Sequence, residues 1–213
     1  MSEQDGSAIL LEVGLPAHMR GRPFGVDESG AQIKRTKGSV VRSTVEYFLE
    51  CVETRGGKAA REEAAEKLVA ALNAAVGDPA YQVSLDYLLN EANAYSVEFD
   101  VYLSRITERL SGDPQYNFNR GRRGIPDAVA FFVRPFSIGQ VYNLLPRLSA
   151  KVAETDFRVV RVGSNSAVIQ WWAEKDMQTL PRELHPVFVD YSCKYIQGVL
   201  GEIPVVLRKL PRA

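Results

Sequence analysis

The segment from residue 125 to residue 172 constrains the fold more than any other part of the sequence, because its residue pattern changes several times. Residues 127–136 are mostly apolar and rich in aromatic and β-branched side chains, which predicts a strand that ends at Pro135. Residues 157–162 and 167–172 have a similar character, and the sequence Gly-Ser-Asn-Ser between them predicts a β-hairpin. The segment therefore predicts a strand, a helix and a two-stranded hairpin.

The helix within this segment is predicted by its first residues. Ser137 stands three positions before Gln140, which is the spacing of a capping box. Pro146 is expected to bend or end the helix, because proline cannot donate a backbone hydrogen bond. One face of the helix is apolar and carries Ile138, Val141, Tyr142 and Leu145.

The chain between residues 39 and 110 is predicted to be helical. Apolar residues recur at helical spacing in residues 39–55 and 58–76, and Gly56-Gly57 separates the two runs. Residues 84–110 form either one long helix or two helices that meet near Tyr95. A last helix begins near Thr179 or His185 and is closed by Gly201 and Pro204, and its apolar stripe is Leu184, Phe188, Tyr191, Tyr195 and Val199.

These elements predict an α+β fold in which an N-terminal helical section packs on a small antiparallel sheet with flanking helices. Residues 1–38 are expected to be a partly flexible N-terminal arm, with one short strand at residues 8–13. Residues 39–114 form the helical section, and residues 115–213 form an α+β section that folds together with it. The join at residues 115–124 is polar and rich in turn-forming residues.

Charge and cysteine content limit the classes of partner and compartment. The sequence has 26 basic and 26 acidic side chains, so bulk charge predicts no binding to nucleic acid or to anionic membranes. No apolar run approaches the roughly 18 residues that a membrane-spanning helix requires, and the N-terminus does not resemble a signal peptide. Cys51 and Cys193 are far apart and form no disulfide framework, which predicts a cytoplasmic protein.

The residues that could carry chemistry are few, and no catalytic residue is predicted. His18 and His185 are the only histidines, which leaves little material for a metal site. His185 could be a lone haem ligand, although a half-exposed histidine at a helix start is the simpler interpretation. The glycine-interleaved arginines of residues 115–124 could bind an anion, but a solvated linker is the more ordinary reading of Arg120, Arg122 and Arg123.

Aromatic residues are concentrated in the second half of the chain and provide the more useful signal. Neighbouring residues on a strand point to opposite faces, so Phe131 with Phe132, and Trp171 with Trp172, cannot both serve one core. The second face is a further core layer, a subunit interface or a ligand pocket. Cys193 lies between tyrosines on the last helix, where a buried structural thiol is more common than a ligand-contacting one.

Three stretches resemble a known group of regulatory regions. They read IPDAVAFFVRPFSIGQVYNLLPRL, FRVVRVGSNSAVIQWW and YSCKYIQGVLGEIP, and the resemblance covers roughly residues 84 to 205. They are similar to N-terminal sensory regions of bacterial adenylate or guanylate cyclases and sensor histidine kinases. More distantly, they resemble 4-vinyl-reductase-type domains, haem nitric-oxide-binding domains and transport-particle subunits. The resemblance implies a regulatory region that acts on a C-terminal output module or a partner protein.

The resulting hypothesis is a sensor domain that binds a small apolar or aromatic molecule and signals as a homodimer. No cofactor is assigned, with haem as the outside candidate. Two alternatives remain: a dimerisation module in which residues 39–55 and 84–110 pack across a two-fold axis, or a small-molecule enzyme that uses Arg120 or Arg123 with an acid. The residues predicted to line the ligand cavity are Phe132, Tyr142, Trp171, Tyr191 and Cys193.

Overall fold

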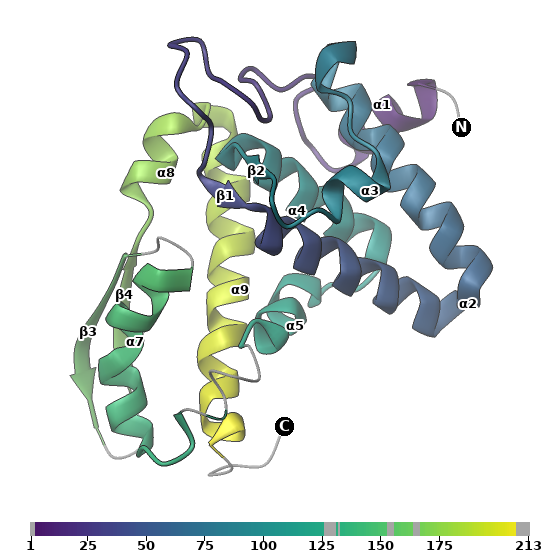
Figure 1. Cartoon of the computed structure of the whole chain (residues 1–213). Coiled ribbons are helices and arrows are strands. Elements are labelled where there is room, and N and C mark those ends of the chain that lie inside the picture. The colour runs from purple at the N-terminus through teal and green to yellow at the C-terminus, as the bar shows by residue number, and fades with distance from the viewer. Residues whose placement is uncertain (1–2, 126–130, 132, 153–155, 164–166, 208–213) are drawn as a thin grey trace. The chain divides into compact units, whose positions relative to one another are not determined.

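The protein has an α+β fold of two compact units, seen in a computed structural model that describes residues 3–125, 131, 133–152, 156–163 and 167–207 (Figure 1). The first unit comprises residues 1–116 and 179–191, and the second comprises residues 117–178 and 192–213. The chain therefore leaves the first unit, builds most of the second, returns to the first and ends in the second. That the two sections fold together remains a prediction.

The first unit is mainly helical. Its longest element, α2, combines the two helices predicted at residues 39–55 and 58–76, and Gly57 separates them with a φ of 76°. Gly77 then ends α2 with a positive φ and donates its backbone N–H to the Asn73 carbonyl. The elements of this unit are α1 (Glu3–Glu12), β1 (Thr36–Lys37), α2 (Gly38–Val76), α3 (Leu85–Leu88), β2 (Ala94–Tyr95) and α4 (Val97–Ser111), with short 3-10 turns at Pro79–Tyr81 and Arg182–Leu184.

The strand predicted at residues 8–13 is wrong, because these residues continue helix α1 and then turn away from it. α1 packs against α2, and Leu10 and Val13 are buried. Gly6 permits this close approach, since a Cβ atom there would lie 2.6 Å from the Ala70 carbonyl oxygen. A short apolar run has no clear period, and here the apolar surface of a neighbouring helix decides its conformation.

The predicted arm is held from residue 16 onward by side chains of α4. Glu98 is buried and accepts the backbone N–H groups of Arg20 and Gly21, at 2.9 and 2.8 Å. Tyr102 is fully buried, and its hydroxyl donates to the Pro16 carbonyl at 3.0 Å. These bonds satisfy backbone groups that no strand or helix serves.

Residues 84–110 form two helices, as one of the two predicted arrangements requires. Ser84 caps α3 and Ser96 caps α4, each through a side-chain oxygen that accepts a backbone N–H three residues later. α4 ends at Gly112, whose φ of 64° is left-handed. β2, which lies between α3 and α4 in the chain, pairs antiparallel with β1. Thr36 lies opposite Tyr95, and Lys37 lies opposite Ala94.

The second unit contains the predicted hairpin. Its strands pair antiparallel with Phe157 opposite Trp171 and Val159 opposite Ile169, and the register shifts between Val159 and Arg161. α7 lies along the hairpin (Figure 1). The elements that lie wholly or largely in this unit are α5 (Tyr116–Arg123), α7 (Ile138–Val152), β3 (Asp156–Val162), β4 (Ala167–Trp172), α8 (Glu174–Thr179) and α9 (His185–Val206), the last of which begins in the first unit.

The capping box of α7 is confirmed. The Ser137 backbone N–H donates to the Gln140 side-chain oxygen at 2.8 Å, and Ser137 Oγ accepts the Gln140 N–H at 3.3 Å. The helix continues through Pro146, so Pro146 does not end it, and the alternative of a bend there stays a prediction. Its predicted apolar face joins a cluster whose buried members are Val133, Val141, Leu145, Ile203 and Leu207.

Three further expectations for this unit are corrected. The strand predicted at residues 127–136 is absent where the structure describes that stretch, because Phe131 and Val133 are helical and residues 134–136 form a turn and bend. The polar join at residues 115–124 is helix α5 rather than a linker. α9 runs past Gly201 and through Pro204, since residues 201–206 remain helical.

Candidate functional site

The residues predicted to line a ligand cavity are distributed over both units. Tyr191 belongs to the first unit, whereas Tyr142, Trp171 and Cys193 belong to the second. Phe132 lies outside the described residues. Their assembly into one cavity remains a prediction.

Within the second unit, Tyr142 and Trp171 take part in local packing. Tyr142 is half-buried against the apolar cluster, and its hydroxyl donates to the Leu200 carbonyl at 3.1 Å. Burial raises the pKa of Tyr142. Trp171 is half-buried opposite Phe157, whereas Trp172 is 39% exposed, so the predicted alternation of the tryptophan pair is confirmed.

Along α9, Tyr191 is buried and Cys193 is half-buried. The Tyr191 hydroxyl donates to Asp100 Oδ2 at 2.9 Å, and its ring meets Phe188 edge to face at 5.7 Å. Cys193 has a free thiol. Tyr191 is therefore fixed to α4 within the first unit.

The arginines of α5 are engaged inside the second unit rather than solvated. Arg120 is buried, and its guanidinium lies 4.9 Å from the centre of the Tyr195 ring. Arg122 Nε pairs with Glu202 Oε2 at 2.9 Å, and the Glu202 side chain is only 2% exposed. Arg123 lies in the last turn of α5. The more ordinary reading of a solvated linker is wrong, and the anion-binding reading stays a prediction.

The candidate haem ligand His185 lies at the start of α9. Its Nε2 is 3.1 Å from the Leu180 carbonyl oxygen. Across the described ranges, no three side chains of His, Cys, Asp or Glu gather in an arrangement that could hold a metal ion.

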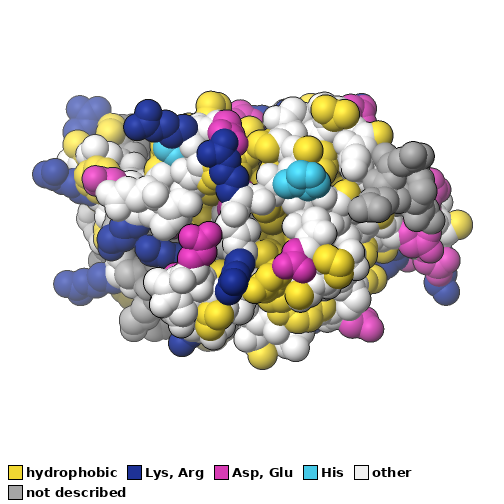
Figure 2. All heavy atoms as spheres, turned by 90° about the horizontal axis from the view of Figure 1, so that it is seen from above, with side chains coloured by type: hydrophobic (Ala, Val, Ile, Leu, Met, Phe, Trp, Pro, Cys, Tyr) yellow, Lys and Arg dark blue, Asp and Glu magenta, His cyan; other side chains and the backbone are white. Residues whose placement is uncertain are grey.

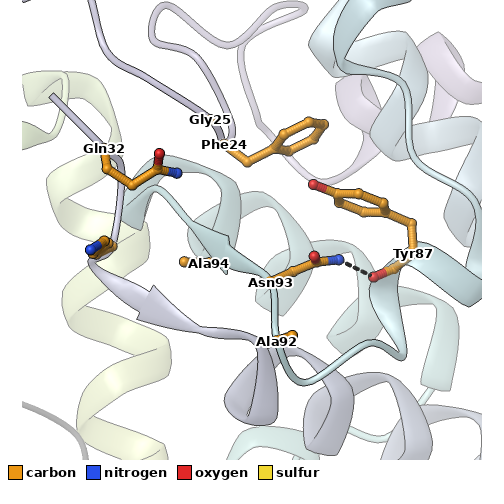
Figure 3. Close-up of a pocket in the computed structure, with 8 residues that line it drawn as sticks. Phe24, Gly25, Gln32, Tyr87, Ala92, Asn93 and Ala94 are labelled. Carbon is orange, nitrogen blue, oxygen red and sulfur yellow. Dashed lines mark hydrogen bonds between the residues drawn. The ribbon is translucent and has the colours of Figure 1, made fainter. Parts of the chain in front are cut away.

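The first unit contains a pocket of about 410 Å³ that the sequence analysis did not anticipate (Figure 3). One side comes from the loop before β1, and the other comes from α3 and the turn into β2. Figure 3 shows Gln32 on one side of the opening and Phe24 and Tyr87 on the other. The pocket is lined by Phe24, Gly25, Gln32, Lys34, Tyr87, Ala92, Asn93 and Ala94.

Stacked and edge-on aromatic rings support this pocket. The ring centres of Phe24 and Tyr87 are 4.9 Å apart, and the Tyr95 ring is stacked on the Phe99 ring with 4.8 Å between their centres. The Tyr95 hydroxyl donates to the Tyr87 carbonyl at 3.0 Å, and Asn93 Nδ2 donates to the same oxygen at 2.8 Å. Burial raises the pKa of Tyr87 and raises that of Tyr95 to about 12. Two hydrogen bonds thus hold the backbone from which the Tyr87 ring projects.

A tight turn shapes the loop side of the pocket. Asp27 Oδ1 accepts the backbone N–H groups of Ser29 and Ala31, at 2.9 and 3.0 Å. The Ser29 hydroxyl, which also donates to this oxygen, is the main cause of the lowered pKa of Asp27. Val26 and Gln32 form an antiparallel bridge, which holds Gln32 at the base of the turn.

The turn side of the pocket is joined directly to the start of α2. The Gly38 backbone N–H donates to the Asn93 carbonyl at 2.7 Å. A Cβ atom at Gly38 would lie between 2.5 and 2.7 Å from the carbonyl oxygens of Asn90, Glu91 and Asn93. Only glycine fits this position. The start of α2 is therefore packed directly against the turn that carries the lining residues Ala92 and Asn93.

The pocket lining includes one cationic side chain. Among the described residues that line the pocket, Lys34 is the one charged residue and none carries a carboxylate. Within the described part of the chain, Lys34 pairs with no acidic side chain. Elsewhere on the surface charges of both signs are interspersed with apolar side chains, as the face in Figure 2 shows.

Sequence reasoning missed this pocket because its residues come from segments that no periodic pattern connects. The local signals were turn residues, including Gly25, Asp27 and Gly30 on one side and Asn90 on the other. Such residues predict turns, but they do not predict that two turns lie side by side.

Comparison with known proteins gives no information on the function of this site. No family model, no curated protein and no solved structure matches the chain. None of the helices in the described residues is long and apolar enough to cross a membrane.

Proposed function

We propose that this protein is a regulatory ligand-binding domain that takes up a small molecule in the pocket between Phe24 and Tyr87. The pocket itself is the observation that carries the proposal. It combines two aromatic rings with carboxamide and ammonium groups, so it offers a small molecule both ring contacts and polar contacts. The sensor function predicted from the sequence is retained, but the proposed ligand-binding residues differ from those that the sequence predicted.

The position of the pocket provides a route from ligand to response. Asn93 accepts a hydrogen bond from the first residue of α2, and Pro23, next to Phe24, accepts one from Ser96, the cap of α4. A ligand that draws the two sides of the pocket together would shift the starts of both helices. A regulatory change then requires only that the ligand bind one arrangement more tightly than the other.

The proposal also includes a homodimer, a cytoplasmic location and an output module or partner protein on which the domain acts. These parts rest on the resemblance to bacterial signalling proteins and on the two unpaired cysteines. The chain is not proposed to be an enzyme.

Native mass spectrometry tests this function. The mass of the folded protein is compared with that of the denatured chain, after purification from cell extract and after incubation with a library of small metabolites. We expect an additional mass that is lost on denaturation, and the same spectra count the subunits. Ala92→Trp fills the pocket from an exposed turn and should remove the bound mass.

Ala59→Trp is the matched control, because Ala59 is an exposed alanine on α2 and does not line the pocket. It should retain the ligand. A ligand-free dimer in every condition would favour the dimerisation module instead. A ligand retained equally by the wild type and Ala92→Trp would place binding elsewhere and overturn this assignment.

A further inference from the structure

The pocket residues also indicate which chemical class of ligand fits, an inference that rests on the proposed function. The first indication is charge. Lys34 contributes an ammonium group to a lining without a carboxylate, and within the described residues no acidic side chain neutralises it. Lys34 is exposed, so an anionic group on a ligand can pair with its ammonium group at the pocket opening.

The second indication is shape. Phe24 and Tyr87 present aromatic rings 4.9 Å apart with a tilt of 40°, and both are half-buried. Phe24 also meets Tyr81 and Tyr95 edge to face, at 5.5 and 6.2 Å between ring centres, so a ligand ring would join an existing aromatic cluster at the pocket. Gly25, with a φ of 81°, adds bare backbone beside Phe24, so a flat group can approach closely.

The third indication is hydrogen-bonding capacity at the rim. Gln32 is exposed, and its side chain supplies both a donor and an acceptor on the side opposite the rings (Figure 3). The Tyr87 hydroxyl makes no hydrogen bond to any described residue. These groups can form hydrogen bonds with polar substituents of an aromatic ligand whose negative charge pairs with Lys34.

We propose that the pocket binds a small planar aromatic anion, with its ring against Phe24 and Tyr87 and its carboxylate or phosphate at Lys34. Neutral aromatic molecules of the same shape would share the ring contacts but not the charge contact. Aliphatic anions would share the charge contact but not the rings. The ligand class is therefore defined by an aromatic ring together with a negative charge.

The test is titration of the ¹⁵N-labelled protein with benzoate, phenyl phosphate and benzamide, followed by the backbone amide shifts of Phe24, Gln32 and Ala94. Probes of this size bind weakly, so the comparison of affinities matters rather than their absolute values. An exposed charge contact contributes about 0.2 to 1 kcal/mol, so benzoate should bind about 1.4- to fivefold more tightly than benzamide. This advantage should shrink as salt is added.

Two variants separate the pocket charge from the charge of the surroundings. Lys34→Gln should remove the advantage of benzoate over benzamide and leave benzamide binding unchanged. Arg35→Gln removes the neighbouring exposed cation, which does not line the pocket, and should leave both affinities unchanged. Equal binding of benzoate and benzamide, or an unchanged preference in Lys34→Gln, would overturn the inferred ligand class.

The outcomes distinguish this inference from the proposed function. If none of the three probes shifts the pocket amides while native mass spectrometry detects a ligand that Ala92→Trp removes, the aromatic-anion inference fails and the regulatory pocket stands. If neither experiment detects binding, both fail. If benzamide binds as well as benzoate and Ala92→Trp prevents both, the aromatic-anion inference fails and the regulatory pocket stands.

Discussion

The two units of this protein fill their interiors in different ways. The first unit buries large side chains completely, including Phe48, Tyr95, Phe99 and Tyr102. The second unit brings α5 and α9 so close that their backbones touch: a Cβ atom at Gly121 would lie 2.0 Å from the Tyr195 carbonyl oxygen. The first unit thus fills its interior with large side chains, whereas in the second unit α5 and α9 approach each other at positions without a side chain.

Buried polar groups contribute in both units. In the first unit Glu98 and Tyr102 hold the backbone of the segment that leads to the pocket loop, and Arg105 pairs with the buried Glu108 at 2.8 Å. In the second unit a charged pair, Arg122 with Glu202, joins α5 to α9. The segment that leads to the pocket loop in the first unit is therefore fixed by buried side chains, which is the support that a preorganised site requires.

The largest expected effect comes from adding a methyl group where α5 and α9 meet. A Cβ atom at Gly198 would lie 2.0 Å from the Phe118 carbonyl oxygen, so Gly198→Ala forces two backbones apart. We expect a loss of about 3 kcal/mol from the free energy of unfolding of the second unit. Tryptophan fluorescence during urea unfolding measures it, because Trp171 and Trp172 both lie in β4 of that unit.

Gly201→Ala is the matched control for this substitution, because Gly201 lies in the same helix and a Cβ atom there would meet nothing within 4 Å. It should stabilise the unit by about 0.5 to 1 kcal/mol through its higher helix propensity. Equal effects of the two substitutions would show that the close approach of α5 and α9 does not determine the stability of the second unit.

High pH should affect the first unit through its buried tyrosines. Burial raises the folded-state pKa of Tyr95 from 10.0 to about 12, and it raises that of Tyr102 as well. Above pH 10 the unfolded chain loses phenolic protons that the folded unit retains, so the free energy of unfolding falls as pH rises. Below pH 10 both states are protonated and these groups contribute no pH dependence.

For Tyr95 alone the loss should reach about 2 to 3 kcal/mol as the pH approaches 12. Urea unfolding followed by far-UV circular dichroism between pH 8 and pH 11.5 measures the slope. Tyr95→Phe removes the titrating group and should give a shallower dependence. A slope that is the same in this variant would mean that Tyr95 titrates alike in the folded and unfolded chains.

The sequence predicted those parts of the fold that local chemistry determines. Ser137 with Gln140 predicted the start of α7, Gly56-Gly57 predicted the break in α2, and the two strand-like runs that flank Gly-Ser-Asn-Ser predicted the hairpin. Each of these signals acts within a few residues. The α+β class follows from them.

The failures occurred where distant packing overrides local preference. Gly121 and its polar neighbours predicted a linker, because glycine and asparagine favour turns. They form helix α5 instead, and α9 packs against it so closely that Gly121 has no room for a side chain. Pro204 similarly lies inside α9. The pocket was missed for the same reason, because Phe24 and Tyr87 are brought together only by the fold.

The smallest expected effect tests whether the two units unfold separately. Ser96 caps α4 in the first unit and Ser137 caps α7 in the second, each by accepting a backbone N–H. Replacing either by alanine should cost about 1 kcal/mol. If the units are independent, Ser137→Ala shifts the tryptophan-detected transition and Ser96→Ala does not, although both shift the transition seen by circular dichroism. If both shift both transitions equally, the units unfold as one, and a ligand in the pocket of the first would then stabilise the second as well.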